Sequence, residues 1–444
     1  MAKSKKLLFL EKSLRAMSSL VLKKYHPFII GITGSVGKTS TKEAVFIVLA
    51  SHFRVRRSEK NYNNEIGLPL TVIGAESGGN SFWGWMAVFL KWLGIMIFPI
   101  SYPEILILEM GADRPGDLKY LTGFIRPEIS ILTDISGSHL EFFKSIDGVA
   151  KEKGILAKSL REKDLAILNV DNPQIKKIGS QLKARTLTFG FSPEADIRAS
   201  DVAFNYVNGE DSSVLYSQSK KIKGLSFKLN FKGSTMPVRL NNILSRHNIH
   251  AALAGICVGI EMKINLVEIG AALENFCLPF GRMNLIKGIK NSFIIDDTYN
   301  SSPVSARAAL DVLGEVEAGR KIAVMGDMLE LGADSERGHR EVAKKFAETG
   351  GNIFFAVGER MKAAADELKK RNFDPGNLYV FEDPMSAGKK LQEIIREDDL
   401  ILIKGSQGMR MEKTVEEVMA DPQKSGELLC RQSRKWKEKP WVNV

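Results

Sequence analysis

Residues 34–40, Gly-Ser-Val-Gly-Lys-Thr-Ser, have the types and spacing of a loop that holds phosphate groups. Gly34 and Gly37 allow the backbone to curl so that successive N–H groups point inward, and the helix that follows directs its positive end at the same place. The Lys38 ammonium could reach the β- and γ-phosphates of a nucleotide, and the Thr39 hydroxyl could bind Mg²⁺. The pattern predicts a nucleoside triphosphate site formed by Thr33, Gly34, Ser35, Val36, Gly37, Lys38, Thr39 and Ser40.

The segments on either side of this loop support the prediction, although the loop departs from the strict pattern at one position. Residues 28–30 are an apolar run typical of a buried parallel strand, and apolar residues return at helical spacing over residues 39–50. The strict pattern requires glycine five residues before Gly37, where this chain has Ile32. A glycine turn that merely joins strand to helix is the alternative, but Gly-Lys-Thr-Ser directly between the two elements favours phosphate binding.

Three further side chains could complete a catalytic site with Lys38 and Thr39. Glu109 ends an apolar run, His139 follows another, and Lys153 lies in a helical stretch. In a parallel α/β sheet the carboxyl ends of the strands form the ligand-binding edge. Each of these residues alone could be an ordinary solvated or satisfied side chain. Together they predict a Mg²⁺-assisted phosphoryl-transfer site, in which Thr39, Glu109, His139 and Lys153 surround the metal and the phosphate groups.

The strand and helix pattern predicts two α/β domains preceded by a helix. Residues 1–27 place apolar side chains at intervals of three and four, which indicates an amphipathic helix. We expect it to pack against the next domain, and attachment to a membrane surface is the alternative. Residues 28–279 are predicted to form the nucleotide-binding domain, a parallel sheet with a β-rich part at 186–240. The pattern restarts at residues 280–430, which predicts a doubly wound, Rossmann-like domain, and residues 431–444 are a basic tail.

Composition indicates an ordinary globular protein. The 444 residues suffice for two or three domains, and 44% of them are hydrophobic and 26% charged. The three cysteines lack CxxC spacing, which suits a reducing cytoplasm and argues against a structural zinc site. The formal net charge of +11 suits anionic partners, but no nucleic-acid-binding motif accompanies it, so we expect no nucleic-acid partner.

Residues 82–98 are almost entirely apolar and contain three of the five tryptophans. The segment is short for a transmembrane helix, and Lys91 lies near its middle. It suits an interfacial helix that contacts a membrane or a partner, and it equally suits a buried helical hairpin. The sequence leaves both alternatives open.

The chain resembles the Mur ligases of peptidoglycan synthesis over residues 29–417. The last four of nine motifs, in the family's order, resemble the branch that joins D-alanyl-D-alanine to UDP-N-acetylmuramoyl-tripeptide. The nine are Ile32-Thr-Gly-Ser-Val-Gly-Lys-Thr-Ser, Asn63-Asn-Glu-Ile-Gly-Leu-Pro-Leu-Thr, Glu109-Met-Gly-Ala, His139-Leu-Glu, Arg246-His-Asn, Gly281-Arg-Met, Asp296-Asp-Thr-Tyr-Asn-Ser-Ser-Pro, Gly326-Asp-Met-Leu-Glu-Leu-Gly with His339, and Lys404-Gly-Ser-Gln-Gly-Met-Arg-Met-Glu.

The resemblance implies a mechanism. In this family ATP phosphorylates a carboxylate to an acyl phosphate, and the amine of an amino acid or dipeptide attacks it to give an amide, ADP and phosphate. Lys38 would contact the transferring phosphoryl group, Thr39 and Glu109 would hold one Mg²⁺, and His139 would help to hold a second. Lys153 falls where the family has a lysine that is often carbamylated, and a carbamate would be a metal-binding anion.

The resemblance also implies roles for residues outside the phosphate loop. Asn248 would lie near the adenine, while Arg282 and the loop from Asp297 to Asn300 would close on ATP from the second domain. Candidates for substrate contact are Asn63, Asn64, Glu330 and Lys404. For Asn63 and Asn64, which precede a glycine and a proline, simple turn chemistry is the alternative.

Single residues depart from the family's motifs at Ile155, where its Lys-Gly-Glu has glutamate, and at Ala251, where it has a second asparagine after His-Asn. Two larger features also depart from the family's pattern. Its enzymes carry a UDP-sugar domain before the phosphate loop, where residues 1–27 stand here, and residues 82–98 resemble an insertion. We expect a monomeric, cytoplasmic ligase of the D-alanyl-D-alanine-adding branch, with peripheral contact to the inner membrane face through 82–98 as an option. One alternative is the same chemistry on another carboxylate, lipid-linked or folate-like. The other is a nucleotide-binding regulatory protein without ligase turnover.

Overall fold

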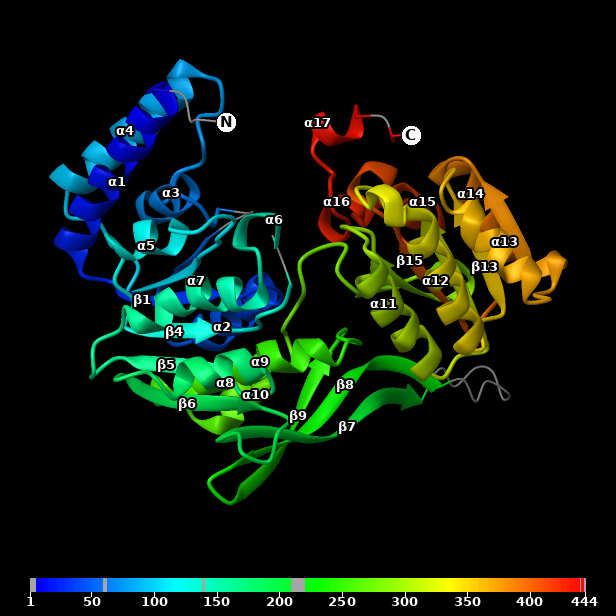
Figure 1. The fold of residues 1–444 in the computed structure, drawn as a ribbon, viewed down its shortest axis with the longest axis horizontal. Coiled ribbons are helices and arrows are strands. Elements are labelled where there is room, and N and C mark those ends of the chain that lie inside the picture. The colour runs from blue at the N-terminus through cyan, green and yellow to red at the C-terminus, as the bar shows by residue number, and fades with distance from the viewer. Residues whose placement is uncertain (1–4, 59–61, 138–139, 209–219, 440, 443–444) are drawn as a thin grey trace. The chain divides into compact units, whose positions relative to one another are not determined.

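The computed structural model describes residues 5–58, 62–137, 140–208, 220–439 and 441–442. They belong to two compact units (Figure 1). The first unit comprises residues 1–202, 227–239 and 246–276, and the second comprises residues 203–226, 240–245 and 277–444.

The first unit is built on the parallel part of a nine-stranded sheet with the order β2-β3-β1-β4-β5-β6-β7-β8-β9. Its central strands are buried apolar runs, as expected of parallel strands covered by helices on both faces. The strands are β1 (Phe28–Thr33), β2 (Val55–Arg57), β3 (Ile105–Glu109), β4 (Ile129–Leu132), β5 (Leu165–Asn169), β6 (Arg185–Gly190), β7 (Ile197–Asn208), β8 (Lys220–Phe231) and β9 (Ser234–Asn241). The β-rich segment predicted at 186–240 thus contains strands that extend the same sheet.

Helices cover both faces of this sheet. On one face α2 (Lys38–Leu49) packs against α9 (His247–Glu261) and α10 (Leu266–Leu273). The other face carries a hydrophobic core shared by seven helices. These are α1 (Lys5–Tyr25), α3 (Gly67–Ile73), α4 (Phe82–Ile97), α5 (Asp117–Thr122), α7 (Ile146–Lys158) and α8 (Pro173–Gly179), with the short α6 (Leu140–Phe143) next to α7.

Residues 5–25 form α1, which buries Leu14 and Val21 in the hydrophobic core of the first unit. The apolar segment 82–98 forms one helix, α4, and only its Val88 and Ile95 are buried. The alternative of a buried helical hairpin is therefore wrong. Trp85, Trp92 and Met96 of α4 are partly buried against the core. The exposed apolar side chains of the helix are Phe82, Trp83, Phe89, Leu90 and Ile97.

The second unit contains a doubly wound sheet with the order β10-β11-β15-β12-β13-β14, parallel except for the β10–β11 pair. Its strands are β10 (Asn284–Lys287), β11 (Phe293–Asp297), β12 (Arg320–Gly326), β13 (Ile353–Val357), β14 (Leu378–Phe381) and β15 (Asp399–Lys404). The helices are α11 (Pro303–Glu315), α12 (Ser335–Glu348), α13 (Lys362–Lys370), α14 (Pro384–Ile394), α15 (Glu412–Val418), α16 (Ser425–Leu428) and α17 (Arg434–Lys437). The predicted α/β class with two such sheets is confirmed.

Candidate functional site

The predicted phosphate loop joins the end of β1 to the start of α2, and the end of β4 holds it in shape. The Ser35 N–H donates to the Asp134 carbonyl at 2.8 Å, and the Thr133 hydroxyl donates to the Val36 carbonyl at 2.6 Å. A Cβ atom added to Gly34 would lie 2.0 Å from Thr133 Oγ1, so only glycine fits there. The neighbouring strand therefore defines the curl of the loop.

The N-terminus of α2 is arranged for an anion. Gly37 precedes the helix in the left-handed region, with φ of 84°, which glycine adopts without strain. No side chain among the described residues caps this helix start, so its first N–H groups point toward the loop unsatisfied by a cap. The Lys38 Nζ atom donates to the Gly34 carbonyl at 2.7 Å, which places the ammonium over the loop. Positive charge, helix dipole and N–H groups converge there.

A carboxylate and a hydroxyl meet beside the loop. The Thr39 hydroxyl donates to Glu109 Oε2 at 3.0 Å, joining the first turn of α2 to the end of β3. Lys42 lies 3.8 Å from the same carboxylate oxygen and donates to the Ser58 carbonyl at 2.8 Å. The Asn63 amide lies 3.5 Å from Glu109 Oε1. Glu109 is almost fully buried, and its carboxylate contacts the side chains of these three residues.

This donor set fits Mg²⁺. Magnesium prefers hard oxygen ligands and is commonly held by one or two carboxylates together with phosphate oxygens. Thr39 and Glu109 supply a hydroxyl and a carboxylate in direct contact. In the part of the chain that the structure describes, no group of three or more His, Cys, Asp or Glu side chains could hold a metal ion by itself. His139 lies outside the described residues.

Lys153 projects from α7 and is only 2% exposed. Burial, together with the nearby positive charge of Lys38, lowers the pKa of Lys153 to about 8, against the opposing charges of Asp113 and Glu152. A substantial fraction of this amine is therefore neutral near pH 8. Glu152 itself accepts the Gly116 and Leu118 N–H groups at 2.9 Å and positions the loop before α5.

The remaining predicted residues of the first unit lie in two places. Asn64 accepts the N–H groups of Gly67 at 2.9 Å and of Ile66 at 3.2 Å, which is turn chemistry at the start of α3. Asn248 is buried in the first turn of α9, the helix that packs on α2. Asn63 and Glu109 are in contact, whereas Asn64 forms the turn beside them.

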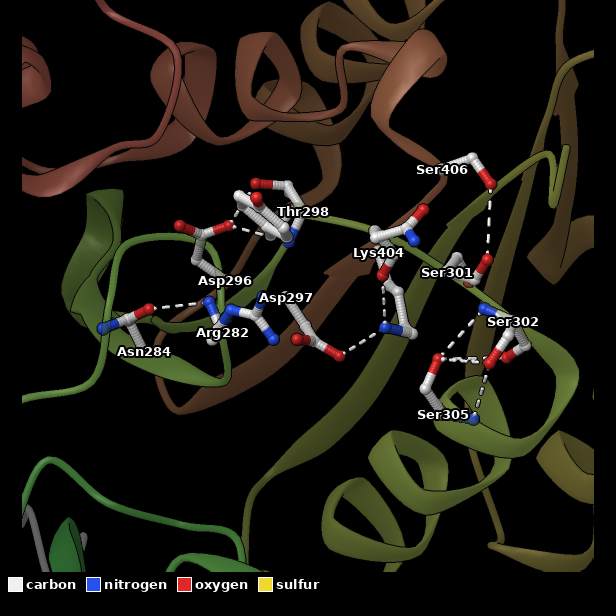
Figure 2. Close-up of polar contacts among 12 residues, drawn as sticks. Arg282, Asn284, Asp296, Asp297, Thr298, Ser301, Ser302, Ser305, Lys404 and Ser406 are labelled. Atoms are coloured by element: carbon white, nitrogen blue, oxygen red, sulfur yellow. Dashed lines mark hydrogen bonds and ion pairs between the residues drawn. The ribbon is translucent and has the colours of Figure 1, made fainter. Parts of the chain in front are cut away.

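In the second unit, polar residues gather where β11 and β15 end (Figure 2). Lys404 is 1% exposed, and its Nζ atom donates to Asp297 Oδ2 at 2.6 Å and to the Asn300 carbonyl at 2.8 Å. The exposed Arg282 guanidinium stacks 4.3 Å from the centre of the Tyr299 ring. Arg282, Asp297 and Asn300 are thus neighbours in one loop cluster, as their sequence grouping suggested. Lys404 is a buried ion-pair partner within it.

Asp296 lies fully buried next to this cluster. Burial raises the pKa of Asp296 to about 7, and the Thr298 hydroxyl, which donates to Asp296 Oδ1 at 2.6 Å, opposes that rise. Its Oδ2 atom has no hydrogen-bond partner among the described residues. Two other motif residues differ in exposure. Glu330 is exposed at a turn with φ of 67°, whereas His339 is fully buried.

His339 orders the turn after β12. Its Nε2 atom accepts the Met328 N–H at 3.0 Å while Nδ1 donates to the Ser335 carbonyl at 2.7 Å. Burial lowers the pKa of His339, which keeps the ring neutral. Asp327 in the same turn accepts the Met361 N–H at 2.7 Å. The His339 and Asp327 side chains therefore both form hydrogen bonds with backbone groups.

Sequence reasoning missed two residues of the phosphate site. Thr133 and Lys42 both touch it, yet neither belongs to the glycine-rich motif. Lys42 follows Thr39 by three residues, and helix geometry puts such a pair on one face, which was an available signal. Thr133 follows the apolar run of β4, and its contact depends on which strands are neighbours in the sheet.

A glycine loop between strand and helix, with a hydroxyl and a carboxylate beside it, defines a P-loop α/β protein. Residues 96–259 match the Mur ligase middle domain, and residues 281–407 match the Mur ligase glutamate ligase domain. A UDP-N-acetylmuramoyl-tripeptide–D-alanyl-D-alanine ligase of Rickettsia prowazekii is 30% identical over 421 residues, which are 93% of this chain and 83% of that protein. The chain belongs to the Mur ligase family.

Other relatives have the same name. The enzyme so named in Bacillus subtilis is 28% identical over 92% of this chain and 80% of its own length. Among solved structures, MurF from Acinetobacter baumannii has a TM-score of 0.73 at 22% identity, covering 91% of this chain and 79% of that one. MurF ligase from Thermotoga maritima in complex with ADP has a TM-score of 0.70 at 24% identity, covering 92% and 83%. These two structural likenesses concern the fold.

Proposed function

We propose that this chain is an ATP-dependent ligase that joins D-alanyl-D-alanine to a UDP-N-acetylmuramoyl-tripeptide in the cytoplasm. The observation that carries the proposal is the 3.0 Å contact between the Thr39 hydroxyl and the Glu109 carboxylate beside the Lys38 loop. A nucleotide-binding scaffold needs neither this oxygen pair nor a buried lysine nearby. The names of the relatives supply the two substrates.

The chemistry requires a carboxylate to become a good acyl donor. The tripeptide carboxylate oxygen attacks the γ-phosphorus of ATP, the bond to the β–γ bridging oxygen breaks, and ADP leaves. The free amine of D-alanyl-D-alanine then attacks the acyl carbon, loses a proton, and inorganic phosphate departs as the amide forms. Lys38 turns from its own loop carbonyl to the phosphate oxygens, and the first N–H groups of α2 hold the β-phosphate.

A metal ion and a modified lysine complete the proposed site. Bound Mg²⁺ would neutralise phosphate charge, and Thr39 and Glu109 are the residues that would hold it, with His139 for a second ion. Lys153 suits carbamylation because CO₂ reacts with a neutral amine, and burial provides one near pH 8. The carbamate would turn a cation into an oxygen-bearing anion.

In the proposed enzyme, residues 28–279 bind the nucleotide and residues 280–430 close on ATP. Arg282, Asp297 and Asn300 are its contacts from the second domain, and Asn248 lies on the adenine side. Asn63, Glu330 and Lys404 remain candidates for substrate contact. The membrane contact expected from residues 82–98 involves another surface and does not depend on ligase activity.

The test is phosphate release by the purified chain with ATP, Mg²⁺ and pairs of acceptors and amines. Turnover is expected with UDP-N-acetylmuramoyl-tripeptide and D-alanyl-D-alanine together and not with either alone, and Lys38→Ala should abolish it. Turnover only with a lipid-linked or folate-like carboxylate would replace the substrate and retain the ligase. ATP binding without turnover on any pair would contradict the ligase assignment.

A further inference from the structure

The outer surface of α1 and α4 is apolar and basic, although both helices are well packed on their inner sides. Trp83 is 77% exposed, Phe9 74% and Phe82 69%, and Leu90, Ile97 and Phe98 are also exposed. Several exposed apolar side chains of this size on two neighbouring helices of a folded protein indicate a binding surface. We call the exposed side chains of these two helices and of Phe98 the α1–α4 surface.

The surface is held rigidly. Lys24 Nζ donates to the Ile95 and Met96 carbonyls at 2.9 Å, and the Tyr25 hydroxyl donates to the Ile95 carbonyl at 2.9 Å. The Trp92 indole N–H donates to the Met17 carbonyl at 3.0 Å. The end of α1 therefore fastens the end of α4, and the two helices lie side by side on the first unit (Figure 1). Such contacts present the apolar residues without the entropy cost of ordering a loose segment.

The exposed charged side chains on these helices have one sign. Lys5, Lys6, Lys12 and Lys23 are exposed on α1. The only acidic residue of either helix, Glu11, is 7% exposed. A second copy of the chain would bring like charges together, which disfavours self-association through this surface. Helices that expose tryptophan, phenylalanine and leucine together with lysine suit the surface of a lipid bilayer, which is apolar inside and can carry anionic headgroups.

We propose that the α1–α4 surface binds the anionic surface of a lipid bilayer, with α4 lying in the headgroup region. Of the helices that the structure describes, none is long and apolar enough to span a membrane, so the contact is peripheral. Trp83, Leu90 and Ile97 recur at helical spacing and would enter the interface together. The lysines of α1 would contact lipid phosphate or carboxylate groups.

The experiment is co-sedimentation of the full-length chain with vesicles of phosphatidylcholine alone or mixed with phosphatidylglycerol. Binding should require phosphatidylglycerol and weaken at high salt, because screening reduces attraction between exposed charges. Trp83→Ser with Leu90→Ser should lower the partition coefficient at least about tenfold, since both lose interfacial apolar area. The matched control is Val267→Ser with Val304→Ser, which removes valines that are 71% and 69% exposed elsewhere.

Charge is tested in the same way. Lys5→Gln with Lys12→Gln and Lys23→Gln should remove the preference for phosphatidylglycerol, whereas Lys183→Gln with Lys370→Gln and Lys389→Gln removes the same charge from exposed sites elsewhere and should not. All variants should retain the wild-type melting temperature and phosphate release with soluble substrates. Those two readouts separate this proposal from the proposed ligase function.

Tryptophan quenching provides an independent measurement that needs no destabilised variant. Brominated lipid should quench the fluorescence of the wild-type chain, and Trp83→Phe should lose part of that quenching while it remains bound. Equal vesicle binding by the Trp83→Ser, Leu90→Ser variant and the wild type would overturn the proposal. If that variant differed from the wild type in oligomeric mass but not in vesicle binding, the surface would be a self-association site, and the proposal would also be overturned.

Discussion

Two lysines near strand ends, one in each unit, have opposite environments. Lys38 is half-buried, and its Nζ atom contacts a neutral carbonyl of its own loop at 2.7 Å. Lys404 is 1% exposed and contacts the Asp297 carboxylate at 2.6 Å. The acceptor for Lys38 in that contact is a neutral carbonyl of the phosphate loop, whereas the Asp297 carboxylate neutralises Lys404. The first environment suits an incoming anion, and the second suits a fixed structural contact.

Lys38→Ala should show the largest effect and separates activity from stability. Phosphate release should fall by about 10³-fold or more, because a cation that stabilises a transferring phosphoryl group contributes on that scale. The free energy of unfolding should change by only about 1–2 kcal/mol, since Lys38 donates half-buried hydrogen bonds to the Gly34 carbonyl at 2.7 Å and the Ser35 carbonyl at 3.4 Å. Stopped assays of phosphate release and urea unfolding measure the two quantities. A variant that unfolds readily would show Lys38 to be structural, like Lys404.

Lys404→Met should affect stability more than activity, the reverse of Lys38→Ala. It leaves the largely buried Asp297 carboxylate without its cation, which costs about 3–5 kcal/mol of unfolding free energy. The second substitution Asp297→Asn, made in the same chain, should recover much of this loss because no charge then remains buried. Urea unfolding of the single and double variants gives the coupling. A stable Lys404→Met variant with impaired turnover would instead make Lys404 a substrate contact.

The pH dependence of stability extends the comparison of lysine environments to Lys153. Its pKa of about 8 lies below the ordinary 10.5, so between these pH values the unfolded chain binds more protons than the folded one. The contribution of Lys153 to stability therefore improves as pH rises through that window and is least favourable below pH 8. Lys153→Met removes this dependence. Its stability relative to wild type should be greater below pH 8 than above pH 10.5 by about 3 kcal/mol.

Carbonate-free buffers are needed for that measurement, because a carbamate on Lys153 would reverse the local charge. The readout is the difference between the two chains in urea unfolding across the alkaline range, in which other titrations cancel. A constant difference would mean that Lys153 titrates as an exposed lysine and that its burial is relieved in solution. Lys404, whose partner is a carboxylate, serves as the contrasting buried lysine.

Local patterns in the sequence were sufficient for much of this fold. The buried runs of β1, β3, β4 and β5 and the glycine loop were predictable because strand burial and phosphate-loop geometry depend on nearby residues. The role of Thr133 was not, because it depends on β4 lying next to β1. Likewise, Lys404 and Asp297 are 107 positions apart and meet only because β15 pairs with β11. The exposure of α4 was also undetermined, since apolar periodicity does not show whether another element covers a helix.

The smallest predicted effect concerns the hydroxyl that holds the phosphate loop. Thr133→Val removes the 2.6 Å hydrogen bond to the Val36 carbonyl while nearly conserving side-chain shape, at a cost of about 1 kcal/mol. Because the bond shapes the loop, we expect the KM for ATP to rise several-fold with little change in global stability. Ser406→Ala is the matched control, since Ser406 accepts the Leu329 N–H at 2.8 Å in the second unit.

The control should lose similar stability without raising the KM for ATP, if nucleotide phosphates bind at the loop of the first unit. Steady-state kinetics at varied ATP, together with urea unfolding of both variants, provides the comparison. An equal rise in KM from both substitutions would mean that the Ser406 turn contributes to ATP binding as much as the phosphate loop does. The functional distinction between the two regions would then be lost, and Lys404 would again be a candidate for a catalytic role.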